Sequence, residues 1–206
     1  MILLDAGHGG YIEGETQTPN RGIYGELESF SEGQYNRMIV HGIAFRLSSM
    51  NIPIHIVCPE NQDKSLPTRA TRINKICRKH GRLNCFLLSV HQNGFSNSSV
   101  KGFELFTSPG HTDSDQYAEI IAKLFGSLFP ERKKRWWKES KRAKEARYYI
   151  LRRTICPAVL TEWGFMTNPS EQALLKSDRG IMEQINFLAD VCANIYLDHL
   201  KPNQEK

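Results

Sequence analysis

The sequence has no continuous apolar run that approaches the roughly 18 residues needed to cross a bilayer as a helix, so we expect no membrane span. It also has no internal repeats, which excludes the repeat architectures. Ahead of Asp5 there is neither a basic region nor a cleavage motif, and we therefore expect synthesis in the cytoplasm without a signal peptide. At 206 residues the chain is long enough for one substantial core.

Paired cysteines are also missing. The five cysteines are odd in number, are scattered, and never stand in a C-x-x-C spacing: Cys58, Cys77, Cys85, Cys156 and Cys192. This pattern argues against a disulfide framework and against a cysteine zinc site. We expect reduced, mostly buried thiols.

The excess of basic residues is small and local. The net charge is +5, from 27 Lys and Arg against 22 Asp and Glu, which favours an anionic partner without identifying one. Residues 130–147 hold nine of the Lys and Arg residues, together with Trp136 and Trp137. This segment is either a solvated helix or loop, or a surface that meets a polyanion and stacks its tryptophans on rings of sugar or base. We treat Trp136 and Trp137 as candidate substrate contacts.

Strand and helix patterns alternate along the chain. Apolar runs predict strands at residues 2–7, 52–58, 85–90, 101–107 and 158–163. Apolar residues at helical spacing predict helices at 35–50, 66–80, 117–129 and 181–196, whereas 148–153 fits either a short strand or a helix. The alternation predicts an α/β fold: a single domain over residues 1–200, with a twisted, mostly parallel (mixed) sheet of about six strands and helices on both faces. Residues 201–206 are predicted to form a tail.

Three of the apolar runs lead to polar, ionisable residues. ILLDAGHGG carries His8 among glycines, LLSVHQNGF carries His91, and AVLTEWGF carries Glu162. In open α/β sheets, ligands bind in the crevice beyond the carboxyl ends of the strands, so these side chains indicate a single site. Two imidazoles at strand ends are ligands that zinc prefers.

Glu32 is a candidate third ligand, because two histidines and one carboxylate form a catalytic zinc site with an open position. It stands seven residues before Ile39, which places it toward the buried side of the predicted helix. The alternative is helix capping, since Ser29 and Glu32 have the spacing of a capping box. Ser31 and Gln34 form an equally good box that leaves Glu32 available for a ligand.

Glu162 is flanked by apolar residues, and a carboxyl group in such surroundings suits a general base or acid near neutral pH. The alternative is a core carboxylate paired with an arginine. Asn93 follows the second histidine and is a candidate substrate contact. Asn168 precedes Pro169 and stands three residues before Glu171, which predicts a helix N-cap instead.

Taken together, four segments resemble the zinc-dependent N-acetylmuramoyl-L-alanine amidases, the cell-wall hydrolases of bacteria and their phages. These segments are LDAGHGG, the E-x-x-x-N of Glu32 to Asn36, SVHQN and PAVLTEWGFMTNPSE, which occur in the family's order. By position, the resemblance implies that His8, Glu32 and His91 bind one Zn²⁺ and that Glu162 is the catalytic carboxylate. It also implies a mixed sheet flanked by helices.

The resemblance further implies the reaction, which is hydrolysis of the amide bond between the lactyl group of N-acetylmuramic acid and L-alanine in peptidoglycan. A phage or prophage lysin that reaches the cell wall or periplasm by another route fits the lack of a signal peptide. Peptidoglycan is then the expected partner, and nucleic acid is not expected. LPTRATRIN, with Arg69, Arg72 and Asn74, also resembles the family, and we interpret these residues as structural more than catalytic.

Two other functions remain open at the level of the sequence. A zinc carboxypeptidase or another metalloamidohydrolase could use the same His, Glu, His set. A non-catalytic module that binds the cell wall or nucleic acid through the basic tryptophan segment is an alternative from a different class. The presence of all four candidate metal-binding and catalytic residues argues against a non-catalytic module; they are His8, Glu32, His91 and Glu162.

Overall fold

A six-stranded sheet lies at the centre of the computed structural model, which describes residues 1–18, 22–23, 30–136 and 143–200. Its strands are β1 (Ile2–Ala6), β6 (Ile54–Ile56), β7 (Phe86–Asn93), β8 (Glu104–Thr107), β9 (Lys144–Glu145) and β10 (Ala158–Phe165). Their order across the sheet is β6-β1-β7-β10-β8-β9. The first four strands in this order run parallel, whereas β8 is antiparallel to β10.

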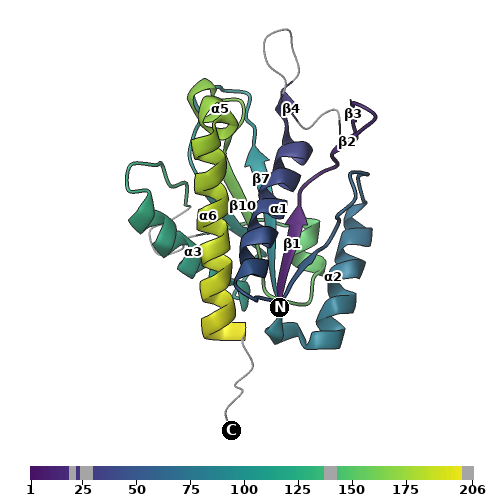
Figure 1. The fold of residues 1–206 in the computed structure, drawn as a ribbon. Coiled ribbons are helices and arrows are strands. Elements are labelled where there is room, and N and C mark those ends of the chain that lie inside the picture. The colour runs from purple at the N-terminus through teal and green to yellow at the C-terminus, as the bar shows by residue number, and fades with distance from the viewer. Residues whose placement is uncertain (19–21, 24–29, 137–142, 201–206) are drawn as a thin grey trace.

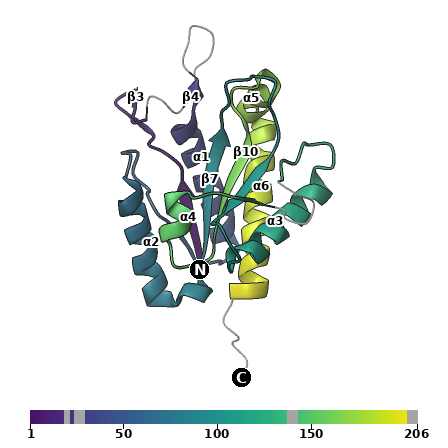
Figure 2. The same cartoon turned by 180° about the vertical axis from the view of Figure 1, so that it is seen from behind.

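Helices cover both faces of the sheet. On one face α1 (Glu32–Ser49), α3 (Ser114–Leu128) and α6 (Asp178–Ile195) share an apolar cluster, and Figure 1 shows α1 and α6 in front of the strands. On the other face α2 (Leu66–His80) and α4 (Tyr149–Arg153) share a second cluster, and both helices come to the front when the molecule is seen from behind in Figure 2. These are called the α1 face and the α2 face below.

Side chains of the central strands alternate between the two faces. On β7, Leu88 and Val90 join the cluster of the α1 face, and Leu87 joins the cluster of the α2 face. Ser89 and His91 continue the row of Leu87, so His91 lies on the α2 face. Because both faces are covered, the central strands show continuous apolar runs instead of an alternating pattern.

The predicted fold class is confirmed, since the chain forms an α/β domain with a mostly parallel, mixed sheet. The strand expected at 101–107 begins only at Glu104. Gly102 has a φ of 121°, and its N–H donates to the carboxylate of Glu171 instead of a neighbouring strand. Residues 148–153, for which the sequence fits either a strand or a helix, contain the helix α4. The tail at 201–206 lies outside the described residues, and the domain boundaries stay predictions.

Several short elements were not predicted. They include the antiparallel pair of β2 (Tyr11–Ile12) with β3 (Glu15–Thr16), the antiparallel pair of β4 (Gly22–Ile23) with β5 (Phe30–Ser31), and the edge strand β9. The helix start predicted at Asn168 is that of α5 (Pro169–Lys176), whose end was not predicted. Two-residue strands are too short for an alternating pattern, so periodicity could not reveal them.

The five cysteines are buried and free, as expected. Of the helices in the described parts of the chain, none combines the length and the apolar character that a membrane crossing requires.

Candidate active site

His8 lies in a strained turn directly after β1. Its φ of 65° falls in the left-handed region, which costs a residue with a side chain about 1–2 kcal/mol. Gly7 donates its N–H to the Val90 carbonyl at 3.0 Å, so the turn starts while the chain is still bound to β7. A Cβ on Gly7 would lie 2.1 Å from the His91 ring, so only glycine permits this approach. The His8 and His91 ring centroids are 5.1 Å apart.

Glu32 is the first residue of α1, and its carboxylate lies between the two imidazoles. Oε2 is 3.3 Å from His8 Nε2, and Oε1 is 3.0 Å from His91 Nδ1. Oε1 also accepts hydrogen bonds from the Gln92 N–H at 3.2 Å and from Asn36 Nδ2 at 3.4 Å. Donors from α1 and β7 therefore fix the direction of a buried carboxylate.

The proposed Ser31–Gln34 capping box is wrong. Ser31 is the N-cap of α1, but among the residues that the structure describes its side chain makes no cap bond. The Gln34 side-chain oxygen instead accepts the N–H of Tyr11 at 3.3 Å. Ser29 lies outside the described residues. The carboxylate of Glu32 is engaged with the two histidines, which is the arrangement expected of a ligand.

These three side chains fit a metal ion. Their ligand atoms all lie within 4.8 Å of one another. Tetrahedral zinc, with bonds of about 2.0–2.2 Å, separates its ligand atoms by about 3.4 Å. Each imidazole nitrogen lies at a similar distance from one of the two Glu32 oxygens: His8 Nε2 is 3.3 Å from Oε2, and His91 Nδ1 is 3.0 Å from Oε1. Two imidazoles and one carboxylate leave a fourth position for water or substrate.

The electrostatics of the cluster favour a bound cation. Burial acts to raise the pKa of Glu32, but the hydrogen bonds with His8 and His91 outweigh burial and hold that pKa far below its ordinary value. Burial acts to lower the pKa of His91, yet the hydrogen bond and charge of Glu32 raise it above its ordinary value. Glu32 is therefore a buried anion whose charge is balanced either by protonated histidine or by a bound metal ion.

Glu162 on β10 is the register partner of His91 on β7. Partners in a parallel pair project to the same side, so Glu162 also lies on the α2 face. It is half-buried, and its charge adds to the rise in the pKa of His91. Strand pairing thus joins Glu162 to His91, and the contacts of Glu32 with His8 and His91 bring the other two residues to the same site.

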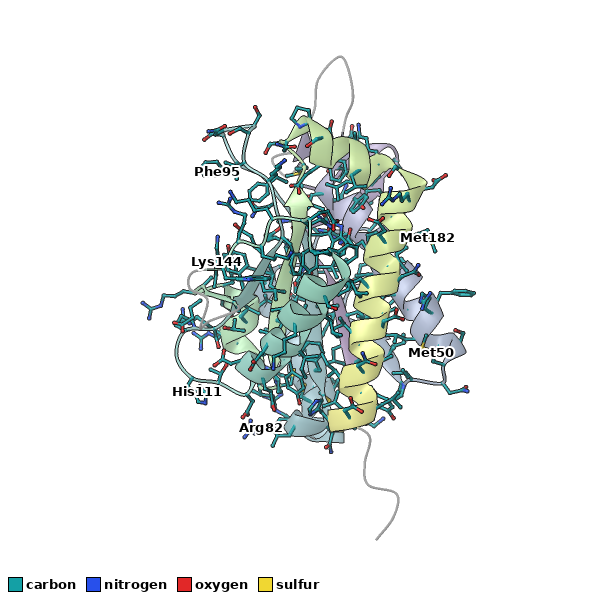
Figure 3. The ribbon with its side chains drawn as sticks, turned by 90° about the vertical axis from the view of Figure 1, so that its left-hand side faces the viewer. Met50, Arg82, Phe95, His111, Lys144 and Met182 are labelled. Atoms are coloured by element: carbon teal, nitrogen blue, oxygen red, sulfur yellow. The ribbon has the colours of Figure 1, made fainter. Side chains whose placement is uncertain are left out.

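Glu104 on β8 is a residue of this region that the sequence analysis missed. It is the register partner of Glu162 on the opposite side from His91, and it is 4% exposed. Its carboxylate accepts hydrogen bonds from Arg135 Nε and Lys144 Nζ, both at 2.7 Å, and from Asn93 Nδ2 at 3.0 Å. Figure 3 shows Lys144 on the side of the molecule away from α6. The signal in the sequence was a carboxylate inside the alternating segment KGFELFT.

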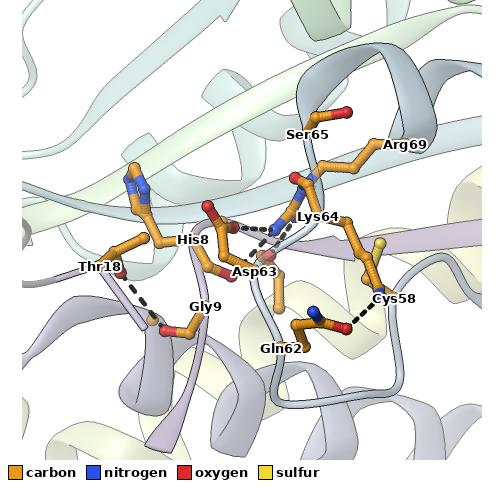
Figure 4. A network of polar contacts seen from close by, with 12 residues as sticks. His8, Gly9, Thr18, Cys58, Gln62, Asp63, Lys64, Ser65 and Arg69 are labelled. Atoms are coloured by element: carbon orange, nitrogen blue, oxygen red, sulfur yellow. Dashed lines mark hydrogen bonds and ion pairs between the residues drawn. The ribbon is translucent and has the colours of Figure 1, made fainter. Parts of the chain in front are cut away.

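A cavity of about 570 Å³ opens beside the two histidines. The loop before α2 and the segment after β3 supply its polar wall, which includes Gln17, Thr18, Asp63 and Lys64. Figure 4 shows this wall close to His8. The cluster is therefore accessible to a molecule much larger than water.

Comparison with known proteins assigns the chain to a family. The family model described as N-acetylmuramoyl-L-alanine amidase matches residues 2–189. The chain belongs to this amidase family. The catalytic domain of the amidase CwlV from Bacillus (Paenibacillus) polymyxa var. colistinus is 21% identical with a TM-score of 0.74, over 96% of this chain and 98% of that one. The amidase from Clostridium difficile 630 is 22% identical with a TM-score of 0.76, over 96% of both chains.

A relative in Staphylococcus aureus, the probable cell wall amidase LytH, is 23% identical over 185 residues. That match covers 89% of this chain and 54% of LytH. The chain thus spans about half the length of the curated relatives it matches.

Asn36 explains the E-x-x-x-N spacing by which the chain resembles the amidases. It lies one turn after Glu32, on the same side of α1. It is fully buried, and its Nδ2 donates both to Glu32 Oε1 and, at 3.2 Å, to the carbonyl of Gly7. One amide therefore ties the carboxylate to the turn that carries His8.

The remaining candidates of this amidase-family chain lie farther from the cluster. Trp136 is half-buried, packs against the core of the α1 face, and makes an edge contact with Phe103 at 6.1 Å between ring centroids. Trp137 lies outside the described residues. Asn93 is bound to Glu104, so substrate contacts by Asn93, Trp136 and Trp137 stay predictions. The predicted cap at Asn168 is confirmed, because its Oδ1 accepts the N–H of Glu171 at 3.1 Å.

Proposed function

We propose that this chain is a zinc-dependent amidase that hydrolyses the bond between the lactyl group of N-acetylmuramic acid and L-alanine in peptidoglycan, acting at the cell wall. Family membership supports the reaction class. The observation that carries the proposal is the pairing of Glu162 with His91, because it places a carboxylate beside the His8, Glu32 and His91 cluster.

His8, Glu32 and His91 would hold the zinc ion. When bound, zinc supplies Lewis-acid chemistry, which activates water and stabilises negative charge that develops on a carbonyl oxygen. The donor set leaves the site with a net charge of about +1, since only Glu32 contributes a negative charge. Asn36 and the Gln92 N–H hold the Glu32 carboxylate in place for this task.

Glu162 is the proposed general base and acid. In the reaction a water molecule adds to the lactyl carbonyl carbon, and the bond from that carbon to the nitrogen of L-alanine breaks. Glu162 accepts a proton from the attacking water and returns it to the leaving amine. The products are the lactyl carboxylate and a stem peptide with a free L-alanine amino group.

Product analysis tests this proposal. Purified peptidoglycan is incubated with the protein, and the released material is examined for new N-terminal L-alanine and for peptide mass. The proposal predicts intact stem peptides that begin with L-alanine. Release of single amino acids from the peptide terminus would instead identify a zinc carboxypeptidase and contradict the proposed bond specificity.

A further inference from the structure

The carbonyl group of His8 is held by two buried arginines. Arg37 donates from Nη1 to this oxygen at 2.7 Å, and Arg69 donates from Nη2 at 2.9 Å. Both side chains are almost fully buried, at 3% exposed for Arg37 and 2% for Arg69. Figure 4 shows Arg69 reaching from α2 toward His8 and Asp63. Two guanidinium groups thus converge on one backbone oxygen of a candidate metal ligand.

Arg69 is itself fixed on the sheet. Its Nη1 donates to Asp5 Oδ1 at 2.7 Å and to the Ala6 carbonyl at 2.6 Å, and Asp5 Oδ2 accepts the hydroxyl of Ser89 at 2.8 Å. The guanidinium therefore spans the end of β1 and the turn after it. Arg69 is thus held directly by β1 and, through Asp5 and Ser89, by β7. These are the two strands that lead to the histidines.

Arg37 fixes the same turn to α1. Its Nη1 also donates to the Gly33 carbonyl at 3.1 Å, while Nε and Nη2 donate to the Glu60 carbonyl at 3.2 Å and 3.0 Å. Gly33 directly follows Glu32 in the first turn of α1. Arg37 therefore connects the backbone of His8 to the backbone beside the carboxylate ligand.

The hydrogen bonds from Arg37 and Arg69 matter because His8 has a left-handed backbone conformation. A left-handed residue with a side chain persists only where its surroundings determine it. The carbonyl and the imidazole of His8 extend from the same Cα, so a relaxation of φ to negative values would turn the ring away from Glu32. An arginine can bind the turn and its anchor at once because its planar fork has five donors, whereas a lysine presents a single point charge.

We propose that Arg37 and Arg69 are positioning residues of the metal centre, which hold His8 in its left-handed conformation so that Nε2 meets the ion. This extends the structural interpretation given to Arg69 from the sequence, and it rests on the metal site of the proposed function. Arg69 also borders the cavity beside the two histidines, but the role proposed for both arginines acts through His8.

The test measures zinc affinity without substrate. Metal-free R69K and R37K are titrated with Zn²⁺ in competition with a chromogenic chelator, and the visible spectrum of the Co²⁺-loaded proteins is recorded. We expect the zinc dissociation constant of R69K to rise by about 10- to 100-fold, as for other residues that orient metal ligands. Added zinc should restore hydrolysis, because Glu162 is unchanged.

Arg72 provides the matched control. It lies one turn after Arg69 on α2, but it donates to the carbonyl of Val57 and to the carboxylate of Glu60 instead of to His8. R72K should therefore bind zinc and Co²⁺ as the wild type does. Circular dichroism of each metal-free variant shows whether it is folded. If R69K does not fold, the zinc affinity of R37K tests the proposal.

Wild-type zinc affinity in folded R69K and R37K would overturn the proposal. An equal loss of affinity in R72K would also overturn it, since the effect would then belong to the packing of α2. Failure of the wild type to bind zinc would instead remove the metal site on which the proposed function depends.

Discussion

Glu162 and His91 occupy paired positions on two adjacent parallel strands, with both side chains on the α2 face. The distance between the proposed base, Glu162, and the candidate metal ligand His91 is therefore set by the register of β10 on β7. That register is fixed by the buried apolar residues of the two strands. Glu104 extends the same row onto β8, so three ionisable side chains lie next to one another across three strands.

Replacement of Glu162 by glutamine should separate catalysis from metal binding. E162Q keeps the shape of the side chain but cannot accept a proton, so we expect hydrolysis of peptidoglycan to fall by about 10²- to 10⁴-fold. Its zinc content, measured by elemental analysis, should equal that of the wild type. An E162Q enzyme of normal activity would remove Glu162 from its role as the base.

Replacement of His91 should abolish both zinc binding and hydrolysis. H91A leaves two ligands, too few for the site, so we expect loss of bound zinc together with loss of hydrolysis. H41A is a suitable control because His41 lies on the exposed side of α1. Zinc retained by H91A at wild-type affinity would contradict the ligand assignment.

Gly33 should be essential to the placement of Glu32. A Cβ at this position would lie 1.8 Å from the Gly9 carbonyl oxygen, a backbone atom that cannot rotate away. G33A should therefore lower the free energy of unfolding by about 1–3 kcal/mol and weaken zinc binding. Gly126 in α3 has open space at its Cβ position, so G126A should instead stabilise the fold by about 0.5–1 kcal/mol. Equal effects of the two substitutions would contradict this account.

Glu104 should contribute to stability through its two cationic partners. E104Q would leave Arg135 and Lys144 without their counter-ion beside the sheet. Because both partners are partly exposed, we expect a loss on the order of 2 kcal/mol in the free energy of unfolding, between the values for buried and surface pairs. Denaturant unfolding measures this loss. E119Q, in the exposed Glu119–Lys123 pair, should cost less than about 0.5 kcal/mol.

The ion pair of Glu60 with Arg72 should make stability depend on pH. Hydrogen bonds from Arg72 lower the pKa of Glu60 from 4.5 to about 2. The unfolded chain then binds more protons than the folded one between these values, so stability from this pair is complete above pH 4.5 and is lost as the pH falls toward 2. The difference in melting temperature between wild type and E60Q should shrink over this range. A difference that grew on acidification would contradict the assignment.

The sequence was sufficient to predict every strand of the central sheet except β9, and also the meeting of the strand ends. Apolar runs that terminate in His8, His91 and Glu162 are local signals, and parallel pairing brings the ends of β1, β7 and β10 to one edge. The sequence did not decide whether Glu32 is a metal ligand or part of a helix cap, because spacing alone cannot show where a side chain is directed.

The contacts that orient the site could not be predicted in the same way. Arg37 and Arg69 reach the carbonyl of His8 from positions 29 and 61 residues away in the chain, through rotamers that only the packed structure defines. Glu104 appeared as one residue of an alternating strand. Its cationic partners, Arg135 and Lys144, come from the basic segment 130–147, which the sequence left open between a solvated helix or loop and a polyanion surface.

Zinc titration of hydrolysis tests the central claim most directly. The metal-free protein, prepared with a chelator, is mixed with purified peptidoglycan and increasing Zn²⁺, and stem peptides with a free N-terminal L-alanine are quantified. The account predicts no release without metal and a plateau at one zinc ion per chain. Full activity in the presence of the chelator, or no release at any zinc concentration by a protein shown to hold zinc, would contradict it.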